Sequence, residues 1–501
     1  MSVTGDDRPR AAPFATAQVL GIAAVLACVL TGLSGRYGFH RDELYFLAAG
    51  DRPAWGYVDQ PPLTPLLARG ATAVLGNTPA GVRVPATLCC AATVILVALV
   101  AGELGGGRRA QVLAACCAAT SGFVLGIGHL ASTTTVDQCV WVLICWLVLR
   151  LLRTGDGRWW IAVGAAVGIG LLNKYLVVLL LIALLPAVAA VGPRRVLRGG
   201  WPAAGAAVAL LLALPNVWWQ ARHGWPQLTV AKGISSDDGT ENRVMFLPQQ
   251  ILYLSPLFVP VWIAGWLRLW REPALRWARA MAVAYPLLCA LVLATGGKPY
   301  YAVPLLLVLT AAGCEAVARW IRAGWRTARG RTVAAALALT AAVSAVLSLP
   351  VLPPGVLAVP NAVNPEQGEQ IGWPALVTAV EQGWSRIPEG RRDRAVILAE
   401  NYGEAGAIEY YGPRHGLPRP YSGHMSYADW GPPPDSADGP VLVVRQDGDR
   451  RIARHFTGCR EVARVDNHHG VDNEEQNAAV MLCSGTTAPW SHLWPSLRHY
   501  Y

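Results

Sequence analysis

Acidic side chains are the first residues of this sequence whose types and positions could do chemistry. Asp42 and Glu43 form an adjacent pair flanked by aromatic residues, and Asp59 follows in the same polar stretch. Asp137 stands near the start of an apolar run, just after the polar stretch 132–135. A partly buried carboxylate needs a partner or a purpose, and it can take a proton from a hydroxyl group. These acids are therefore candidates for general base catalysis.

Isolated lysines are the second candidate group. The chain contains 42 lysines and arginines, of which only three are lysines. Two of these, Lys174 and Lys298, interrupt long apolar stretches. The lysine ammonium group is a compact point charge that suits phosphate. We therefore expect these two lysines to bind the phosphate group of a substrate.

Structural interpretations of the same residues stay open at this point. An acid pair that follows an apolar run can be a solvated loop, and Asp137 can cap the N-terminus of a helix. A lysine at the end of an apolar run can extend its charge to the lipid headgroups.

The composition places these residues in a membrane protein. Hydrophobic residues make up 53% of the 501 residues and charged residues only 15%, whereas about 25% is usual in soluble proteins. The mean hydropathy is +0.34. A disordered chain is excluded, and too little polar surface is present for a soluble enzyme of this size. The net charge of +10 fits arginine-rich cytoplasmic loops, so no nucleic acid partner is expected.

Eleven apolar runs are candidate transmembrane helices. They cover residues 14–33, 84–100, 111–125, 136–152, 159–172, 175–191, 201–214, 251–267, 280–295, 300–318 and 333–349. With eleven spans, all the arginine-rich loops fall on one face, which the positive-inside rule makes cytoplasmic. The opposite face then receives the candidate acids and lysines, a large loop over residues 216–250, and everything after about residue 350. Ionisable groups gathered at one face, without internal repeats, favour an enzyme over a secondary transporter.

The region after the last run is soluble in character. We predict a transmembrane domain over residues 1–349 and an extracytoplasmic α/β domain over residues 350–501. Segments 395–399, 441–444 and 478–482 are expected to be strands, and residues 404–411 a short helix. Cys459 and Cys483 lie in this polar region, where they could form a disulfide or remain two free thiols. The fold class is thus a mostly α polytopic membrane protein of about 11 transmembrane helices with a C-terminal extracytoplasmic α/β domain.

Three motifs resemble glycosyltransferase family 39. They are Arg-Asp-Glu-Leu-Tyr-Phe at 41–46, Asp-Gln-Pro-Pro at 59–62 and Gly-Lys-Pro-Tyr-Tyr at 297–301. That family includes protein O-mannosyltransferases and lipid A aminoarabinose transferases, which share the membrane-embedded C-type fold. The resemblance covers roughly residues 37–304, and the C-terminal domain is similar to that of bacterial members.

The resemblance implies transfer of a sugar from a polyprenyl monophosphate to a hydroxyl acceptor outside the cytoplasm, with inversion at the anomeric carbon. Asp42 matches the family's catalytic acid, Glu43 matches the neighbour of that acid, and Asp137 resembles a second acid near the reaction centre. Lys298 resembles a lysine near the lipid phosphate, although Pro299 follows it directly here. The substrate-binding candidates are Asp59, Lys174, Lys298, Tyr300 and Tyr301.

The sequence leaves several features of the reaction open. The sugar can be a hexose such as mannose or a pentose such as arabinose, and the acceptor can be a protein, a lipid or a glycan. No cofactor is expected; no metal-binding spacing is present, but a divalent ion is not excluded. The expected location is a bacterial plasma membrane. A prenyl phosphate hydrolase is disfavoured because no paired histidine motif is present.

Overall fold

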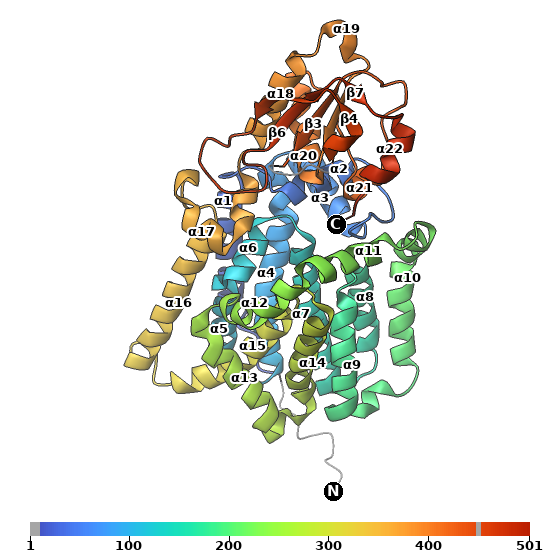
Figure 1. Ribbon diagram of the computed structural model, residues 1–501. Coiled ribbons are helices and arrows are strands. Elements are labelled where there is room, and N and C mark those ends of the chain that lie inside the picture. The colour runs from blue at the N-terminus through green and yellow to red at the C-terminus, as the bar shows by residue number, and fades with distance from the viewer. Residues whose placement is uncertain (1–10, 447–451, 501) are drawn as a thin grey trace.

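The computed structural model describes residues 11–446 and 452–500, and Figure 1 shows a helical body with a smaller, sheet-containing domain at one end. Seven helices in the described part of the chain are long and apolar enough to cross a membrane. Six of them are α1 (Thr16–Leu33), α4 (Pro79–Glu103), α7 (Thr133–Thr154), α10 (Trp201–Arg222), α15 (Val303–Trp320) and α16 (Ala328–Ser348); the seventh, Pro273–Thr295, contains α14 (Arg279–Thr295).

The remaining predicted spans are also helical. Helices α5 (Arg108–Thr120) and α6 (Gly122–His129) form one bent pair, with a bend of 58°. The segment Pro226–Leu252, which ends in α12 (Gly239–Leu252), and the segment that contains α13 (Val259–Arg271) form another, with a bend of 71°. Helices α8 (Trp159–Leu171) and α9 (Val177–Val191) are shorter and apolar. Each of the eleven apolar runs thus coincides with helix, and the predicted mostly helical, multi-pass membrane fold is confirmed.

Glycines allow two helix pairs to pack closely. A Cβ atom on Gly265 of α13 would lie 1.8 Å from the carbonyl oxygen of Leu309, and one on Gly313 of α15 would lie 1.9 Å from that of Val261. Gly164 of α8 and Gly205 of α10 face each other in the same way. Small residues at such contacts are typical of membrane helices, because apolar lipid supplies no hydrophobic drive for association.

The predicted outer loop over residues 216–250 is mostly helical, and its place on the outer face stays a prediction. Helix α10 continues to Arg222, α11 covers Pro226–Gly233, and a π-helical turn (Ile234–Asp238) leads into α12. Pro226 does not interrupt this segment, because proline is well tolerated in the first turn of a helix.

The C-terminal domain is built on a five-stranded sheet in the order β2-β1-β3-β6-β5. Its strands are β1 (Val396–Ala399), β2 (Tyr421–Ser422), β3 (Val441–Arg445), β5 (Arg460–Arg464) and β6 (Ala479–Cys483). Strands β1, β2 and β3 are parallel, whereas β6 pairs antiparallel with both β3 and β5. The three predicted strands correspond to β1, β3 and β6, and the predicted short helix corresponds to α20 (Tyr402–Tyr411).

Successive residues of the central strands face opposite sides, as the strand period of two requires. Ile397 and Leu442 belong to the core beneath α18 (Trp373–Ser385) and α20, while Leu398 and Val443 belong to the core beneath α22 (Trp490–Leu497). A disulfide joins Cys459, just before β5, to Cys483 of β6. Of the two alternatives for these cysteines, the structure contains the bonded one.

A short helix of the N-terminal region shares the core of the C-terminal domain. Helix α2 (Arg41–Gly50) contributes Leu44, Tyr45 and Phe46 to the buried cluster that contains the inner residues of β1 and β3. A Cβ atom on Gly406 of α20 would lie 3.0 Å from the Cβ atom of Leu44, so the two helices are in close contact. The acid pair at the start of α2 therefore lies where the helical body meets the C-terminal domain. The division into residues 1–349 and 350–501 stays a prediction.

Candidate active site

The Asp42 carboxylate lies in the first turn of α2 and is partly exposed. It accepts a hydrogen bond of 2.7 Å from the hydroxyl group of Tyr402, which belongs to α20 of the C-terminal domain. The backbone N–H of Asp42 points to Nδ1 of His40, the N-cap residue, at 3.2 Å. Tyr402, a residue 360 positions away, thus orients this carboxylate, which is not fully enclosed.

The neighbouring carboxylate, Glu43, is enclosed. Glu43 and Arg83 of α4 both have side chains with 0% exposure, and two N–O contacts of 2.8 Å join them. Glu43 also accepts hydrogen bonds of 2.8 Å from the backbone N–H groups of His40 and Ala131. Its oxygens are occupied by these donors, so Glu43 ties α2 to α4 and to the turn before α7.

Asp59 lies in the segment between α2 and α3 (Leu63–Leu75). It accepts a hydrogen bond of 2.6 Å from the hydroxyl group of Tyr45, and that hydroxyl is also 2.7 Å from Oγ of Ser426. Burial raises the pKa of Asp59 from 3.8 to about 6, and the negative charge of Asp42 adds to the increase. The positive charge of Lys174 lowers the pKa of Asp59. Asp42, Asp59 and Lys174 therefore interact electrostatically.

The raised pKa of Asp59 predicts that this residue destabilises the fold at neutral pH. The folded state prefers the protonated acid to the charged one. The stability that protonated Asp59 contributes is therefore fully present below pH 3.8, and it is lost as the pH rises through about 6. Asp59→Asn stays neutral and can still accept from Tyr45. We expect the variant to match the parent in acid and to exceed it by up to about 3 kcal/mol at pH 7.5. Unfolding midpoints of both proteins across this pH range measure the difference; a pH-independent difference would contradict the prediction.

Lys174 occupies the turn between α8 and α9, where the long apolar stretch was expected to divide. Its Nζ atom is 3.5 Å from the hydroxyl group of Tyr300 and 5.9 Å from the ring centre of Tyr301. It interacts electrostatically with Asp137 and Asp42 as well. The structure thus brings these candidate residues together around one cation.

Asp137 does not cap its helix. The N-cap of α7 is Ser132, whose hydroxyl accepts from the backbone N–H of Thr135, and Asp137 lies one turn further along. Its side chain is 7% exposed and accepts a hydrogen bond of 3.0 Å from the indole N–H of Trp141. A buried acid in a membrane helix, close to a lysine, is a functional candidate by default.

Lys298 is placed differently from Lys174. It precedes the 3₁₀ turn η5 (Pro299–Ala302), is 39% exposed, and its Nζ atom lies 3.8 Å from a carboxylate oxygen of Asp238. Tyr300 interacts electrostatically with both Lys298 and Lys174. Tyr300 therefore lies within electrostatic reach of both lysines, and Lys174 also interacts electrostatically with Asp42, Asp59 and Asp137.

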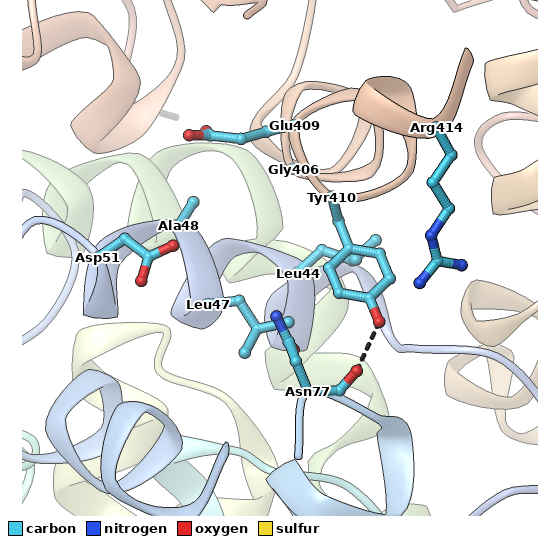
Figure 2. A pocket seen from close by; sticks show the side chains of 9 residues that line it. All are labelled: Leu44, Leu47, Ala48, Asp51, Asn77, Gly406, Glu409, Tyr410 and Arg414. Atoms are coloured by element: carbon cyan, nitrogen blue, oxygen red, sulfur yellow. Dashed lines mark hydrogen bonds between the residues drawn. The ribbon is translucent and has the colours of Figure 1, made fainter. Parts of the chain in front are cut away.

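The described structure has cavities beside α2 and beside α7, and the one beside α7 is lined by predicted site residues. A small cavity of about 10 Å³ is lined by Phe123, Thr134, Asp137, Gln138, Tyr300, Tyr301 and Pro304. Another, of about 270 Å³, lies between α2, α20 and the α3–α4 turn (Figure 2), where the hydroxyl of Tyr410 donates to the carbonyl oxygen of Asn77. None of the predicted site residues lines this second hollow. Within residues 11–446 and 452–500, no group of three or more His, Cys, Asp or Glu side chains could hold a metal ion.

Comparison with known proteins assigns the fold. Residues 59–219 match the family described as dolichyl-phosphate-mannose-protein mannosyltransferase. The structure is similar to that of ArnT from Cupriavidus metallidurans bound to undecaprenyl phosphate, with a TM-score of 0.61 at 14% identity over 93% of this chain and 98% of that one. The apo state of the same protein gives a TM-score of 0.54 at 14% identity, over 93% and 97% of the two chains. No curated protein has a significant match to the chain.

The chain has the C-type membrane glycosyltransferase fold. The resemblance to glycosyltransferase family 39 that the sequence motifs indicated is thereby confirmed. The family match includes Asp59, Asp137 and Lys174, whereas Asp42 and Lys298 lie outside it. The roles of all the predicted site residues in this protein stay predictions.

The sequence alone did not reveal the residues that hold these acids in place. Tyr402 and Ser426 come from the C-terminal domain, and no motif links them to α2. Arg83 could have been noticed, because it directly precedes an apolar run and a charge at that position is costly unless it is paired. Tyr45 belongs to the motif at residues 41–46, but its contact with Asp59 depends on how the chain turns after α2.

Proposed function

We propose that this protein transfers a sugar from a polyprenyl monophosphate to a hydroxyl group of an acceptor, with inversion at the anomeric carbon. The observation that carries the proposal is the position of Asp42: a partly exposed carboxylate, oriented by Tyr402, that interacts with the cation Lys174. The family match and the fold support glycosyltransferase activity. The similar structure of ArnT is described as bound to undecaprenyl phosphate, which supports a lipid-linked donor here.

In this proposal the charged groups divide the reaction between them. Asp42 takes the proton of the acceptor hydroxyl while that oxygen forms a bond to the anomeric carbon. The bond between this carbon and the phosphate oxygen breaks on the opposite face, and its electron pair stays with the phosphate. Lys174 and Lys298 stabilise the phosphate charge, and Tyr300 and Tyr301 surround it. Asp59 and Asp137 contact the sugar, and Glu43 positions α2.

The lysines should differ in how strongly they hold the lipid phosphate. Removing a charged hydrogen-bond partner costs about 1.5–3 kcal/mol, so Lys174→Met is expected to weaken undecaprenyl phosphate binding about 10–100-fold. Lys298→Met should weaken it less, because Lys298 is more exposed and lies near Asp238. Lys232, the third lysine, is exposed on α11 and supplies a matched control. Equilibrium binding in detergent measures all three. Equal affinity in the Lys174 and Lys232 variants would assign Lys174 to the lipid headgroup instead.

We place the active site and residues 350–501 on the extracytoplasmic side of a bacterial plasma membrane. The arginine-rich loops support this orientation through the positive-inside rule, and the Cys459–Cys483 disulfide supports an oxidising compartment. Cysteines introduced at positions 327 and 435 test the orientation in intact cells. Labelling of position 435 and protection of position 327 is expected; the reverse pattern would invert the topology.

Donor discharge is the test of the proposed function. Purified protein in detergent is incubated with radiolabelled mannose, glucose and arabinose donors, each linked to undecaprenyl phosphate, with protein, lipid and glycan acceptors. We expect release of undecaprenyl phosphate from one donor and label transferred to one acceptor class. Transport into sealed liposomes with the donor intact would show a carrier instead.

A further inference from the structure

Gln138 is a buried amide that the proposed reaction has not yet used. It follows Asp137 in α7, and its residue is 2% exposed. Neither Oε1 nor Nε2 has a hydrogen-bond partner among residues 11–446 and 452–500. A buried polar group without a partner costs about 1–3 kcal/mol, and an apolar side chain of similar volume would avoid this cost. Retaining the amide here needs an explanation.

Gln138 lies next to the proposed substrate-binding site. It lines the 10 Å³ cavity together with Asp137 and Tyr300. The Tyr300 hydroxyl is 3.5 Å from Nζ of Lys174, so the cavity is adjacent to the proposed phosphate site. Its volume corresponds to about one water molecule. A ligand group that enters the cavity must therefore be small, as a single hydroxyl group is, and it must be polar to pair with the Gln138 amide.

An amide and a hydroxyl group are chemically complementary. Oε1 can accept from the hydroxyl hydrogen, while Nε2 can donate to the hydroxyl oxygen. A phosphate offers only acceptors at neutral pH and would leave Oε1 unsatisfied. A prenyl chain would satisfy neither atom. Of the three parts of the proposed donor, only the sugar pairs with both amide atoms.

We propose that Gln138 is a sugar-recognition residue that binds one hydroxyl group of the donor sugar. The inference rests on the proposed transferase function and deepens it, because it says which side chain distinguishes one sugar from another. Sites that hydrogen-bond a substrate hydroxyl discriminate strongly against analogues that lack it, since the buried partner is then left unpaired.

The test combines the variant Gln138→Leu with a set of donor analogues. The donor that the parent protein discharges is prepared on undecaprenyl phosphate together with its monodeoxy forms, each lacking one hydroxyl group. We expect the parent to lose about 10–100-fold in kcat/KM for one particular analogue. Gln138→Leu should lose a similar factor with the full sugar and should show little further loss with that analogue. The other analogues should lose equal factors in both proteins, because contacts at separate groups are additive.

Two measurements separate this role from others. Undecaprenyl phosphate lacks the sugar, so its affinity should agree within about two-fold between Gln138→Leu and the parent. Gln220 of α10 supplies a matched control, since it is also fully buried with neither amide atom partnered in the described structure, yet does not line this cavity. Gln220→Leu should keep the discrimination of the parent. If Gln138→Leu does not fold, Gln138→Met replaces it with the same readout.

The outcomes are distinct. A Gln138 variant that discriminates among all analogues as the parent does overturns the inference and leaves the transferase function standing. Equal losses in undecaprenyl phosphate affinity and in kcat/KM would assign Gln138 to the phosphate, which also overturns it. A parent protein that discharges no donor contradicts the proposed function itself, and the role of Gln138 with it.

Discussion

Asp42→Asn is expected to lower turnover at saturating donor by about 10²–10⁴-fold, the usual effect of removing a positioned general base. Asparagine keeps the shape of the side chain and can still accept the hydrogen bond from Tyr402. Folding and undecaprenyl phosphate binding should therefore remain those of the parent. Sugar transfer at saturating donor, measured beside donor affinity, isolates the chemical step from binding.

Three further variants show whether the effect belongs to the base itself. Asp51→Asn is the matched control, because Asp51 is an exposed acid at the other end of the same helix. It should leave turnover unchanged. Tyr402→Phe removes the hydrogen bond that orients Asp42 and should lower turnover less than Asp42→Asn does. Glu43→Gln should also lower it less, since Glu43 is enclosed by Arg83. Turnover of Asp42→Asn within a few-fold of the parent would make Asp137 or Asp59 the leading candidate.

The helical body could be predicted because membrane helices leave a strong local signal. A span needs a run of apolar residues, and each of the eleven runs lies largely in helix. Breaks at residues 173–174 and 296–299 were visible because polar residues and glycines interrupt the runs there. The helices between residues 216 and 250 were missed because their tryptophans, prolines and polar residues give no continuous apolar run.

The active-site contacts could be predicted only in part. Asp42 and Glu43 are adjacent, and successive residues of an α-helix point about 100° apart, so two different environments could be expected. What each environment contains depends on packing between distant segments: Arg83 of α4 for Glu43, and Tyr402 of α20 for Asp42. The sequence also offered a helix cap as one role for Asp137, whereas Ser132 caps that helix. A single cap position could not be chosen from four consecutive hydroxyl residues.

The placement of Tyr402 has a consequence for the C-terminal domain. This domain supplies the hydroxyl that orients Asp42, and its sheet and helices share a core with α2. Tyr45 connects the domain to Asp59 in the same way, through Ser426. We infer that residues 350–501 help to position the candidate acids Asp42 and Asp59.

Arg83→Met is expected to destabilise the protein by about 3–5 kcal/mol, the usual cost of leaving one member of a buried ion pair without its partner. Glu43 would remain enclosed, with its charge opposed only by backbone N–H groups. The carbonyl oxygens of Ser34 and Gly38 would also lose the donors that Arg83 provides. Unfolding of the full chain in detergent measures the loss.

A double variant separates the charge from the packing. Glu43→Gln combined with Arg83→Met removes both charges, so we expect it to recover a large part of the stability that Arg83→Met loses. Arg52→Met serves as the control, because the ion pair between Arg52 and Glu409 is partly exposed and should contribute at most about 1 kcal/mol. A double variant that loses the full sum of the two single losses would contradict the coupling. In that case Glu43 would not depend on Arg83, and the rigid attachment of α2 that holds Asp42 in place would have another origin.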